Sequence, residues 1–151
     1  MESGSELFSR IPELTPQQRV ETYFDLTKSI GNILSSKIWY APDFFVPAAE
    51  TKGITTRDIE FTGGRYRIIR NLGSSFCEIQ IQRNSLRIDN PNIALEEIRF
   101  KVGRPEASDA VPDIAYNRVL RTGGSRTLTN NILAIRKVEK FIAVMAQNVR
   151  S

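Results

Sequence analysis

Hydrophobic residues recur at helical spacing near the start of the chain. Thr15 is a suitable N-cap, Pro16 favours the first helical position, and Gln18 completes a capping box with Thr15. The apolar positions that follow share one face of a helix: Val20, Tyr23, Phe24, Ile30 and Leu34. These signals predict a helix over residues 15–37, preceded by a flexible N-terminus over residues 1–14.

Further along, apolar and polar residues alternate, which is typical of strands. Ile59 and Phe61 alternate with polar neighbours before Gly63–Gly64, a pair suited to a two-residue hairpin turn. The chain then continues as a strand over 65–70 and turns again at 71–74. This pattern predicts a β-hairpin.

Residues 76–83 show the clearest alternation in the chain. Cys77, Ile79 and Ile81 fall on one face, and polar residues separate them. A fourth strand is predicted over residues 85–89, after a short turn. The strands together predict an antiparallel meander with one buried face and one polar face.

Three more elements are expected after the meander. Asn90 and Pro91 provide a helix start, so residues 90–103 predict a second helix. The inner stripe of this helix would be Ile93, Ile98 and Val102. Residues 114–122 predict a fifth strand, and residues 125–149 predict a long C-terminal helix.

The element order predicts an α+β fold in which a meander of four to five strands is covered by an N-terminal, a middle and a C-terminal helix. A length of 151 residues suits a single domain over residues 15–151. No apolar run approaches the ~20 residues needed to cross a bilayer, and the first residues do not resemble a secretory signal. Because Cys77 is the only cysteine, we expect a protein of the cytoplasm or another reducing compartment.

The positive charge is concentrated toward the C-terminus. The chain has a net charge of +4, yet residues 114–151 contain seven Lys or Arg residues against Glu139 alone. Such a local excess attracts polyanions or an acidic partner surface. A solvated helix face is the simpler alternative.

Two glycines precede the predicted C-terminal helix. Gly123 and Gly124 allow a sharp turn, and Ser125 or Thr127 can cap the helix. The first amide groups of a helix favour anions, and Arg126 adds a full positive charge. The segment therefore predicts a phosphate cradle, with an ordinary strand-to-helix turn as the alternative.

The fragment GGSRTL, residues 123–128, resembles the matching segment of the tombusvirus RNA-silencing suppressors, which bind duplex RNA. The resemblance covers these six residues, and the rest of the chain shows no counterpart. Trp39 and Tyr40 lie in roughly the region where that family places tryptophans against duplex ends. They are candidate base-stacking residues, although an aromatic flap over the core edge is the alternative.

The predicted C-terminal helix has two unlike faces. One face is an apolar stripe formed by Leu128, Ile132, Ile135, Val138, Ile142, Met145 and Val149. The other face carries cations, with Leu133 and Val144 among them. Branched aliphatic residues on a basic face predict a homodimer interface at Leu133 and Val144.

The residue types exclude several chemistries. Without histidine, the chain cannot form Ser-His-Asp or Cys-His sites or the usual zinc sites, and no glycine-rich nucleotide motif is present. We therefore expect no cofactor and no resident metal. One enzyme motif remains, because Asp43, Glu50 and Lys52 follow the order of a class of magnesium nucleases. A surface loop is the alternative interpretation.

The leading expectation is a non-enzymatic homodimer that binds RNA or DNA through the phosphate backbone. The residues expected to contact nucleic acid are Arg118, Arg121, Ser125, Arg126, Thr127, Arg136, Lys137 and Lys140. One alternative is a structural or assembly protein, for example a viral subunit, that uses the same helix against protein. The other is the magnesium nuclease.

Overall fold

The computed structural model describes residues 11–34, 53–61, 64–73, 76–84, 92–103 and 111–149. The elements in chain order are α2 (Pro16–Leu34), β1 (Gly53–Phe61), β2 (Gly64–Leu72), β3 (Phe76–Asn84), β4 (Ile93–Gly103), β5 (Asp113–Leu120), β6 (Ser125–Thr129) and α4 (Ile132–Asn148). The strands form one six-stranded sheet in the order β1-β2-β3-β4-β5-β6. Every neighbouring pair is antiparallel, so the sheet is a continuous meander.

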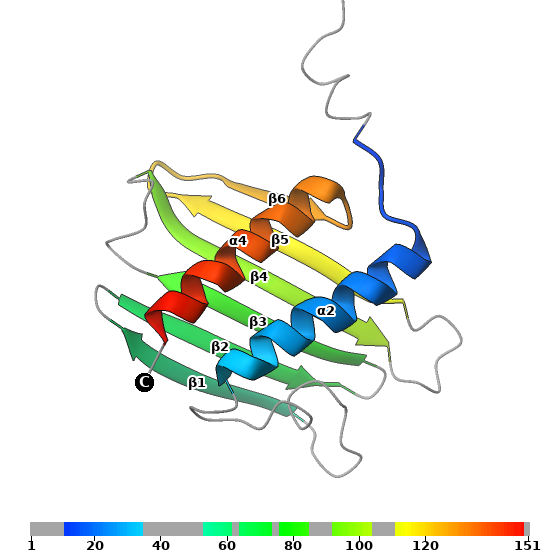
Figure 1. Ribbon diagram of the computed structural model, residues 1–151. Coiled ribbons are helices and arrows are strands. Elements are labelled where there is room, and N and C mark those ends of the chain that lie inside the picture. The colour runs from blue at the N-terminus through cyan, green and yellow to red at the C-terminus, as the bar shows by residue number, and fades with distance from the viewer. Residues whose placement is uncertain are drawn as a thin grey trace, which may run out of the picture.

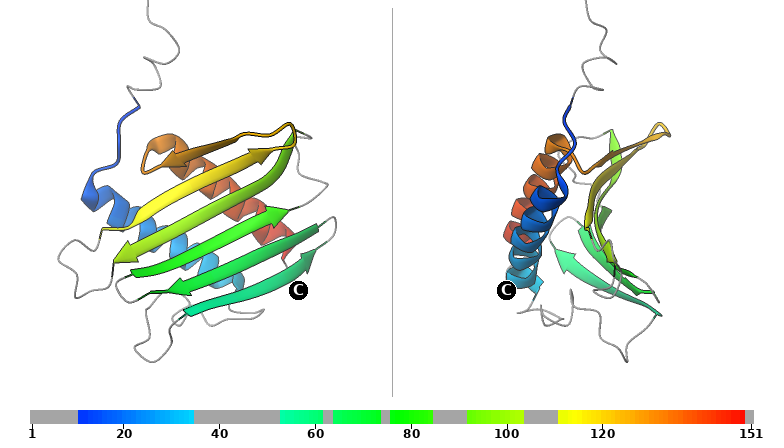
Figure 2. Two further views of the ribbon diagram at one scale, coloured as in Figure 1. Left: turned by 180° about the vertical axis from the view of Figure 1, so that it is seen from behind. Right: turned by 90° about the vertical axis from the view of Figure 1, so that its right-hand side faces the viewer.

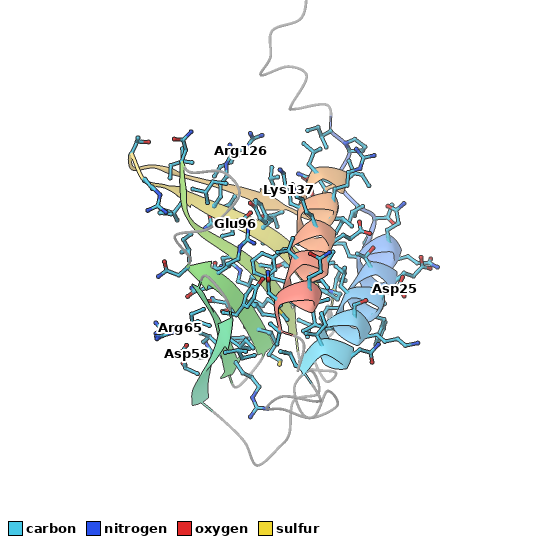
Figure 3. All side chains as sticks on the ribbon, turned by 60° about the vertical axis from the view of Figure 1, so that its left-hand side comes forward. Asp25, Asp58, Arg65, Glu96, Arg126 and Lys137 are labelled. Carbon is cyan, nitrogen blue, oxygen red and sulfur yellow. The ribbon has the colours of Figure 1, made fainter. Side chains whose placement is uncertain are left out.

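Both described helices cover the same face of the sheet (Figure 1). They lie side by side and run in the same direction, and Figure 2 shows that neither of them covers the opposite face. Asp58 and Arg65 lie on that opposite face (Figure 3). The arrangement confirms the predicted α+β class. Within the described residues it has six strands and two helices, which differs from the predicted four to five strands and three helices.

The start of α2 is confirmed in detail. The Thr15 amide donates to Gln18 Oε1 at 2.9 Å, and the Gln18 amide donates to Thr15 Oγ1 at 3.2 Å, which is the predicted capping box. The buried residues of α2 are Tyr23, Leu26, Thr27, Ile30, Gly31 and Leu34. Phe24 is 65% exposed, so its predicted place on the apolar face is wrong. Residues 35–37, the predicted end of this helix, lie outside the described ranges.

The core lies between the helix pair and one face of the sheet. In β3, Cys77, Ile79 and Ile81 are buried and alternate with half-buried residues, as predicted. Ile81 is paired with Ile68 on β2 and with Ile98 on β4. Because the strands are in register, these side chains form a row beneath the helices and join one continuous hydrophobic cluster.

Strand β4 replaces the predicted helix over residues 90–103, so that prediction is wrong. β4 pairs with β3 on one side and with β5 on the other. Ile98 and Phe100 are buried, whereas the intervening Arg99 is half-buried, which is the period of a strand. The helical spacing of the apolar residues in this segment is outweighed by pairing with two neighbouring strands.

The last helix begins later than predicted. Residues 125–129 form β6, paired with β5, and α4 begins at Ile132. The Asn131 side chain caps α4 by accepting a hydrogen bond from the Ala134 amide at 2.8 Å. The predicted helix over 125–149 is therefore right only in its C-terminal part.

The two glycines lie in a hairpin turn, not at a helix entrance. Gly123 and Gly124 have φ angles of 94° and 86°, so both use the freedom that a residue without Cβ has. The turn joins β5 to β6, and Ser125 and Thr127 are strand residues. Their predicted roles as helix caps are wrong.

The predicted apolar stripe is confirmed at Ile135, Val138, Ile142, Met145 and Val149, which are buried, and wrong at its first two residues. Ile132 is 39% exposed, and Leu128 belongs to β6. The buried residues of α4 are Ala134, Ile135, Val138, Phe141, Ile142 and Met145. The stripe was assigned too far toward the N-terminus because the helix was predicted to begin at residue 125.

Asn130 sets the direction in which the chain passes from β6 into α4. Its φ angle is 55°, a left-handed conformation that asparagine tolerates better than most residues. Its side chain accepts a hydrogen bond from the Ile114 amide at 2.9 Å and donates to Asp113 at 2.8 Å. These bonds fix the start of α4 against β5.

The remaining fold predictions concern the turns and the termini. Gly64 pairs with Phe61 at the start of β2, so it is a strand residue and not part of the predicted turn. The predicted strand over 85–89 and most of the predicted flexible N-terminus lie outside the described residues. Neither described helix combines the length and the apolar composition that crossing a membrane requires.

Candidate anion-binding site

Strand alternation separates the predicted phosphate-binding residues of the hairpin onto two faces. Arg118 and Arg126 are opposite each other on β5 and β6, on the helix-covered face that also holds the buried Tyr116. Ser125 and Thr127 alternate with Arg126 and lie on the other face. There the Thr127 hydroxyl donates to a side chain of β5 at 3.0 Å. The predicted cradle is therefore wrong as a single site.

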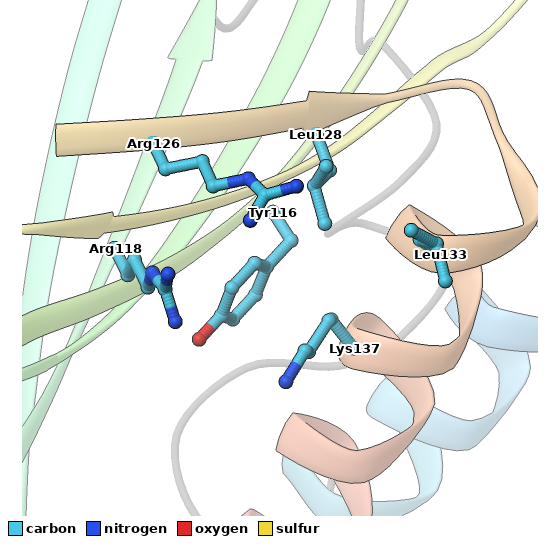
Figure 4. Close-up of a pocket in the computed structure, with 6 residues that line it drawn as sticks. All are labelled: Tyr116, Arg118, Arg126, Leu128, Leu133 and Lys137. Carbon is cyan, nitrogen blue, oxygen red and sulfur yellow. The ribbon is translucent and has the colours of Figure 1, made fainter. Parts of the chain in front are cut away.

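A pocket of about 140 Å³ lies between the β5–β6 hairpin and α4 (Figure 4). Its lining residues are Tyr116, Arg118, Arg126, Leu128, Leu133 and Lys137. The strands contribute two neighbouring cross-strand pairs, and α4 contributes Leu133 and Lys137, which lie one helical turn apart. The pocket forms because residues two apart on a strand and four apart on a helix share a face.

Among the described residues that line the pocket, three are cations and none is acidic. Figure 4 shows the side chains of Arg118, Arg126 and Lys137 arranged around Tyr116. Arg126 and Lys137 are exposed at the rim, whereas Arg118 is half-buried. A local excess of positive charge attracts anions, so the lining favours an anion.

Glu96 lies beside the pocket, and its carboxylate already has bonding partners within the protein. It pairs with Arg118 in the β4–β5 register, and its carboxylate forms an ion pair with Arg83 in which the two side chains are 14% and 10% exposed. It also accepts a hydrogen bond from the Tyr116 hydroxyl. Arg83 balances the charge of Glu96, so this carboxylate leaves the positive charge of the lining in place.

Tyr116 forms the floor of the pocket. Burial, followed by the hydrogen bond to Glu96, raises the pKa of the Tyr116 hydroxyl above its ordinary value. The hydroxyl is therefore protonated at neutral pH and donates to Glu96. The pocket is left with the ring of Tyr116 as an apolar surface.

Arg118 has a donor that the fold leaves unused. Its Nε is buried and has no hydrogen-bond partner within the part of the chain that the structure describes. A buried donor in this state costs about 1–3 kcal/mol. The Nε atoms of Arg19 and Arg83 share this state, but neither of these residues lines the pocket.

The other predicted cations are exposed but do not line the pocket. Arg121 is exposed in the turn after β5, and Arg136 and Lys140 are exposed on α4. Val144 is half-buried one turn beyond Lys140, on the flank of α4 that continues from the pocket. The predicted interface residues Leu133 and Val144 thus share one flank of the helix.

The uncovered face of the sheet has a different electrostatic character. Asp58 lies 3.0 Å from Arg67 and 3.5 Å from Arg65, so it binds two cations. The hydrogen bond from Arg67 holds the pKa of Asp58 below its ordinary value. On the same face, Lys101 lies 4.7 Å from the ring centre of Phe76. These charges are partnered within the protein.

Several predicted site residues lie outside the described ranges. They are Trp39, Tyr40, Asp43, Glu50 and Lys52. Base stacking and magnesium-dependent cleavage therefore stay predictions. Among the described residues, no group of three or more His, Cys, Asp or Glu could hold a metal ion.

Two lining residues were missed from the sequence. Tyr116 was placed on a strand without a role, and Leu128 was assigned to the core face of a helix. The alternation of Tyr116 with Arg118, combined with a strand over 125–129, would have brought both residues to Arg126. The misleading signal was the continuity of helix-compatible residues from Ser125 onward.

Comparison with known proteins identifies no relative. No protein-family model, curated protein or solved structure matches this chain. The resemblance of residues 123–128 to the RNA-silencing suppressors has no support from these comparisons, and these residues form a turn and β6. The function has to be inferred from the site itself.

Proposed function

We propose that this protein is a non-enzymatic nucleic-acid-binding protein that holds phosphate groups of RNA or DNA along the β5–β6 hairpin and the adjoining flank of α4. The observation that carries the proposal is the gathering of Arg118, Arg126 and Lys137 around one pocket that has no acidic residue among its described lining residues. A backbone phosphate there would receive charge-assisted hydrogen bonds, which are about twice as strong as neutral ones.

The surrounding surface extends this charge. Residues 114–149 contain six Lys or Arg residues and a single acidic residue, Glu139. Arg121, in the turn after β5, and Arg136 and Lys140, on α4, are exposed. A nucleic-acid backbone would therefore find further cations on the hairpin and on α4. Contacts of this kind position a backbone and carry no base sequence information.

Salt dependence of binding is the direct test. Short duplex and single-stranded RNA would be titrated with the protein, and fluorescence anisotropy would report the affinity. Phosphate contacts predict a steep loss of affinity between about 50 and 200 mM salt. Association through an apolar protein surface, the assembly alternative, predicts little change.

A pair of variants makes the test specific to the pocket. Lys137→Gln removes one lining cation and should lower the slope of log affinity against log salt by about 1. Lys28→Gln removes the same charge from the exposed side of α2 and should leave the slope unchanged. No binding of either RNA at low salt would reject the proposal.

Homodimerisation through the flank of α4 is part of the proposal. Leu133 and Val144 are both half-buried in the single chain, and a second copy would bury them further. Val144→Ser should therefore convert a dimer to a monomer in light scattering without altering the pocket lining. A wild-type protein that stays monomeric at all concentrations would reject this part alone.

A further inference from the structure

We propose that the pocket between β5, β6 and α4 is a binding site for a small organic anion, in which an apolar body about the size of one six-membered ring carries a carboxylate or phosphate group. This inference goes beyond backbone binding because it assigns a ligand to the apolar interior of the pocket. It does not require that the protein binds nucleic acid.

The interior of the pocket is apolar. Tyr116 is 3% exposed and turns its hydroxyl to Glu96, so its ring is the surface available to a ligand. Leu128 and Leu133 supply aliphatic walls from β6 and α4. A bare phosphate would leave these walls in contact with water, whereas an apolar body would bury them.

The volume of the pocket sets the size of that body. The pocket measures about 140 Å³, and an engineered protein cavity of about 150 Å³ is known to hold benzene. Drug-sized ligands occupy pockets of roughly 300–1,000 Å³. The ligand is therefore a single ring or a branched aliphatic group of similar size.

The cations place the charged end of the ligand at the rim. Arg126 and Lys137 are exposed there, on opposite sides of the pocket, and Arg118 reaches it from β5 (Figure 4). An arginine guanidinium binds a carboxylate or phosphate through two parallel hydrogen bonds. Glu96 does not compete with the ligand, because it is bound to Arg83 and Tyr116. A ligand with its apolar body in the interior and its anionic group at the rim matches this distribution of apolar and positively charged residues.

Isothermal titration calorimetry with four probes tests the inference. Benzoate and phenyl phosphate carry both features, benzyl alcohol lacks the charge, and inorganic phosphate lacks the ring. At least one of the ring-bearing anions should bind at one site per chain, at least about 10-fold more tightly than either incomplete probe. The ranking of benzoate against phenyl phosphate identifies the preferred anionic group. If both bind no better than inorganic phosphate or no better than benzyl alcohol, the inference is overturned.

Two substitutions on α4 form a matched pair. Lys137→Gln should weaken binding of the preferred anion by about 10-fold, because it removes a charge-assisted contact at the rim. Lys140→Gln removes the same charge three residues later, outside the pocket lining, and should change the affinity less than about 2-fold. Equal effects of the two substitutions would indicate diffuse attraction to the helix and would contradict a pocket site.

Filling the pocket tests the role of its apolar interior. Leu133→Trp adds bulk to the α4 wall while keeping every cation, so it should abolish binding of the small anion. Circular dichroism would verify folding, and the smaller change Leu133→Phe serves if the tryptophan variant does not fold. Full retention of small-anion affinity in the folded variant would overturn the inference. Wild-type protein that binds the small anion but neither RNA would reject only the nucleic-acid proposal.

Discussion

Arg118 on β5 lies directly opposite Arg126 on β6, and both side chains line the pocket beneath the flank of α4. Like charges directly opposite each other destabilise an antiparallel strand pair. On the uncovered face of the same sheet, Asp58 binds both Arg65 and Arg67. An anionic ligand between the opposed arginines would be attracted to both of them.

Replacing Arg126 should separate stability from binding. Arg126→Gln changes an exposed side chain of β6, so we expect the free energy of unfolding in urea to stay within about 1 kcal/mol of wild type. Binding of RNA and of the small anion should both weaken. A loss of more than about 2 kcal/mol with undiminished binding would show that Arg126 has a structural role only.

The cap of α4 can be tested at Asn131. Asn131→Ala removes the bond to the Ala134 amide and should lower the free energy of unfolding by about 1 kcal/mol. Asn131→Asp keeps an acceptor and should stay close to wild type. Thr127→Ala, at a residue that the sequence suggested as a cap, should cost less than about 0.5 kcal/mol. A larger loss in the free energy of unfolding for Thr127→Ala than for Asn131→Ala would contradict the observed helix start.

The buried hydroxyl of Tyr116 predicts a response to alkaline pH. Its raised folded-state pKa means that the native state keeps this proton when the unfolded state, with a tyrosine pKa of about 10, releases it. This stabilisation is complete below about pH 10 and is lost as the pH rises through the folded-state pKa. Urea unfolding should therefore show a steeper alkaline loss of stability for wild type than for Tyr116→Phe.

At neutral pH the same variant should be the less stable protein. Tyr116→Phe removes a hydrogen bond to the ionised Glu96 and should cost about 1.5–3 kcal/mol. Its binding of the small anion should persist, because the ring remains. If the free energy of unfolding of wild type and of Tyr116→Phe depended on pH in the same way, the buried hydrogen bond from the Tyr116 hydroxyl to Glu96 would be contradicted.

The lowered pKa of Asp58 predicts a loss of stability at acidic pH. Its folded-state pKa is lowered by the hydrogen bond from Arg67, so its contribution to stability is present above the unfolded-state pKa of about 3.9 and is lost as the pH falls through the folded-state value. Asp58→Asn should flatten the loss of stability below about pH 4. The control Asp25→Asn removes an exposed carboxylate from α2 and should leave the wild-type profile.

The sequence predicted those elements that local signals determine. The capping box of Thr15 and Gln18 and the alternation around Ile79 needed no knowledge of distant residues, and both are confirmed. Strand β4 was predicted as a helix because its two partner strands, which decide its conformation, cannot be seen in a local pattern.

The site was predicted only in part for the same reason. The cations Arg118, Arg126 and Lys137 were identified from composition, but the pocket depends on the pairing of β5 with β6 and on the later start of α4. Once residues 125–129 are a strand, Leu128 faces Tyr116 and the two arginines face each other. The site is formed by the register between β5 and β6, which cannot be read from composition.

The most direct test of the account is to locate the bound anion on the protein by nuclear magnetic resonance. Phenyl phosphate would be titrated into isotope-labelled protein, and the shifted amide and methyl resonances would be assigned. The account predicts saturable shifts centred on Tyr116, Arg118, Leu128 and Leu133, and their loss in Leu133→Trp. Shifts that do not saturate, or that centre on α2 or on the uncovered face around Asp58, would contradict it.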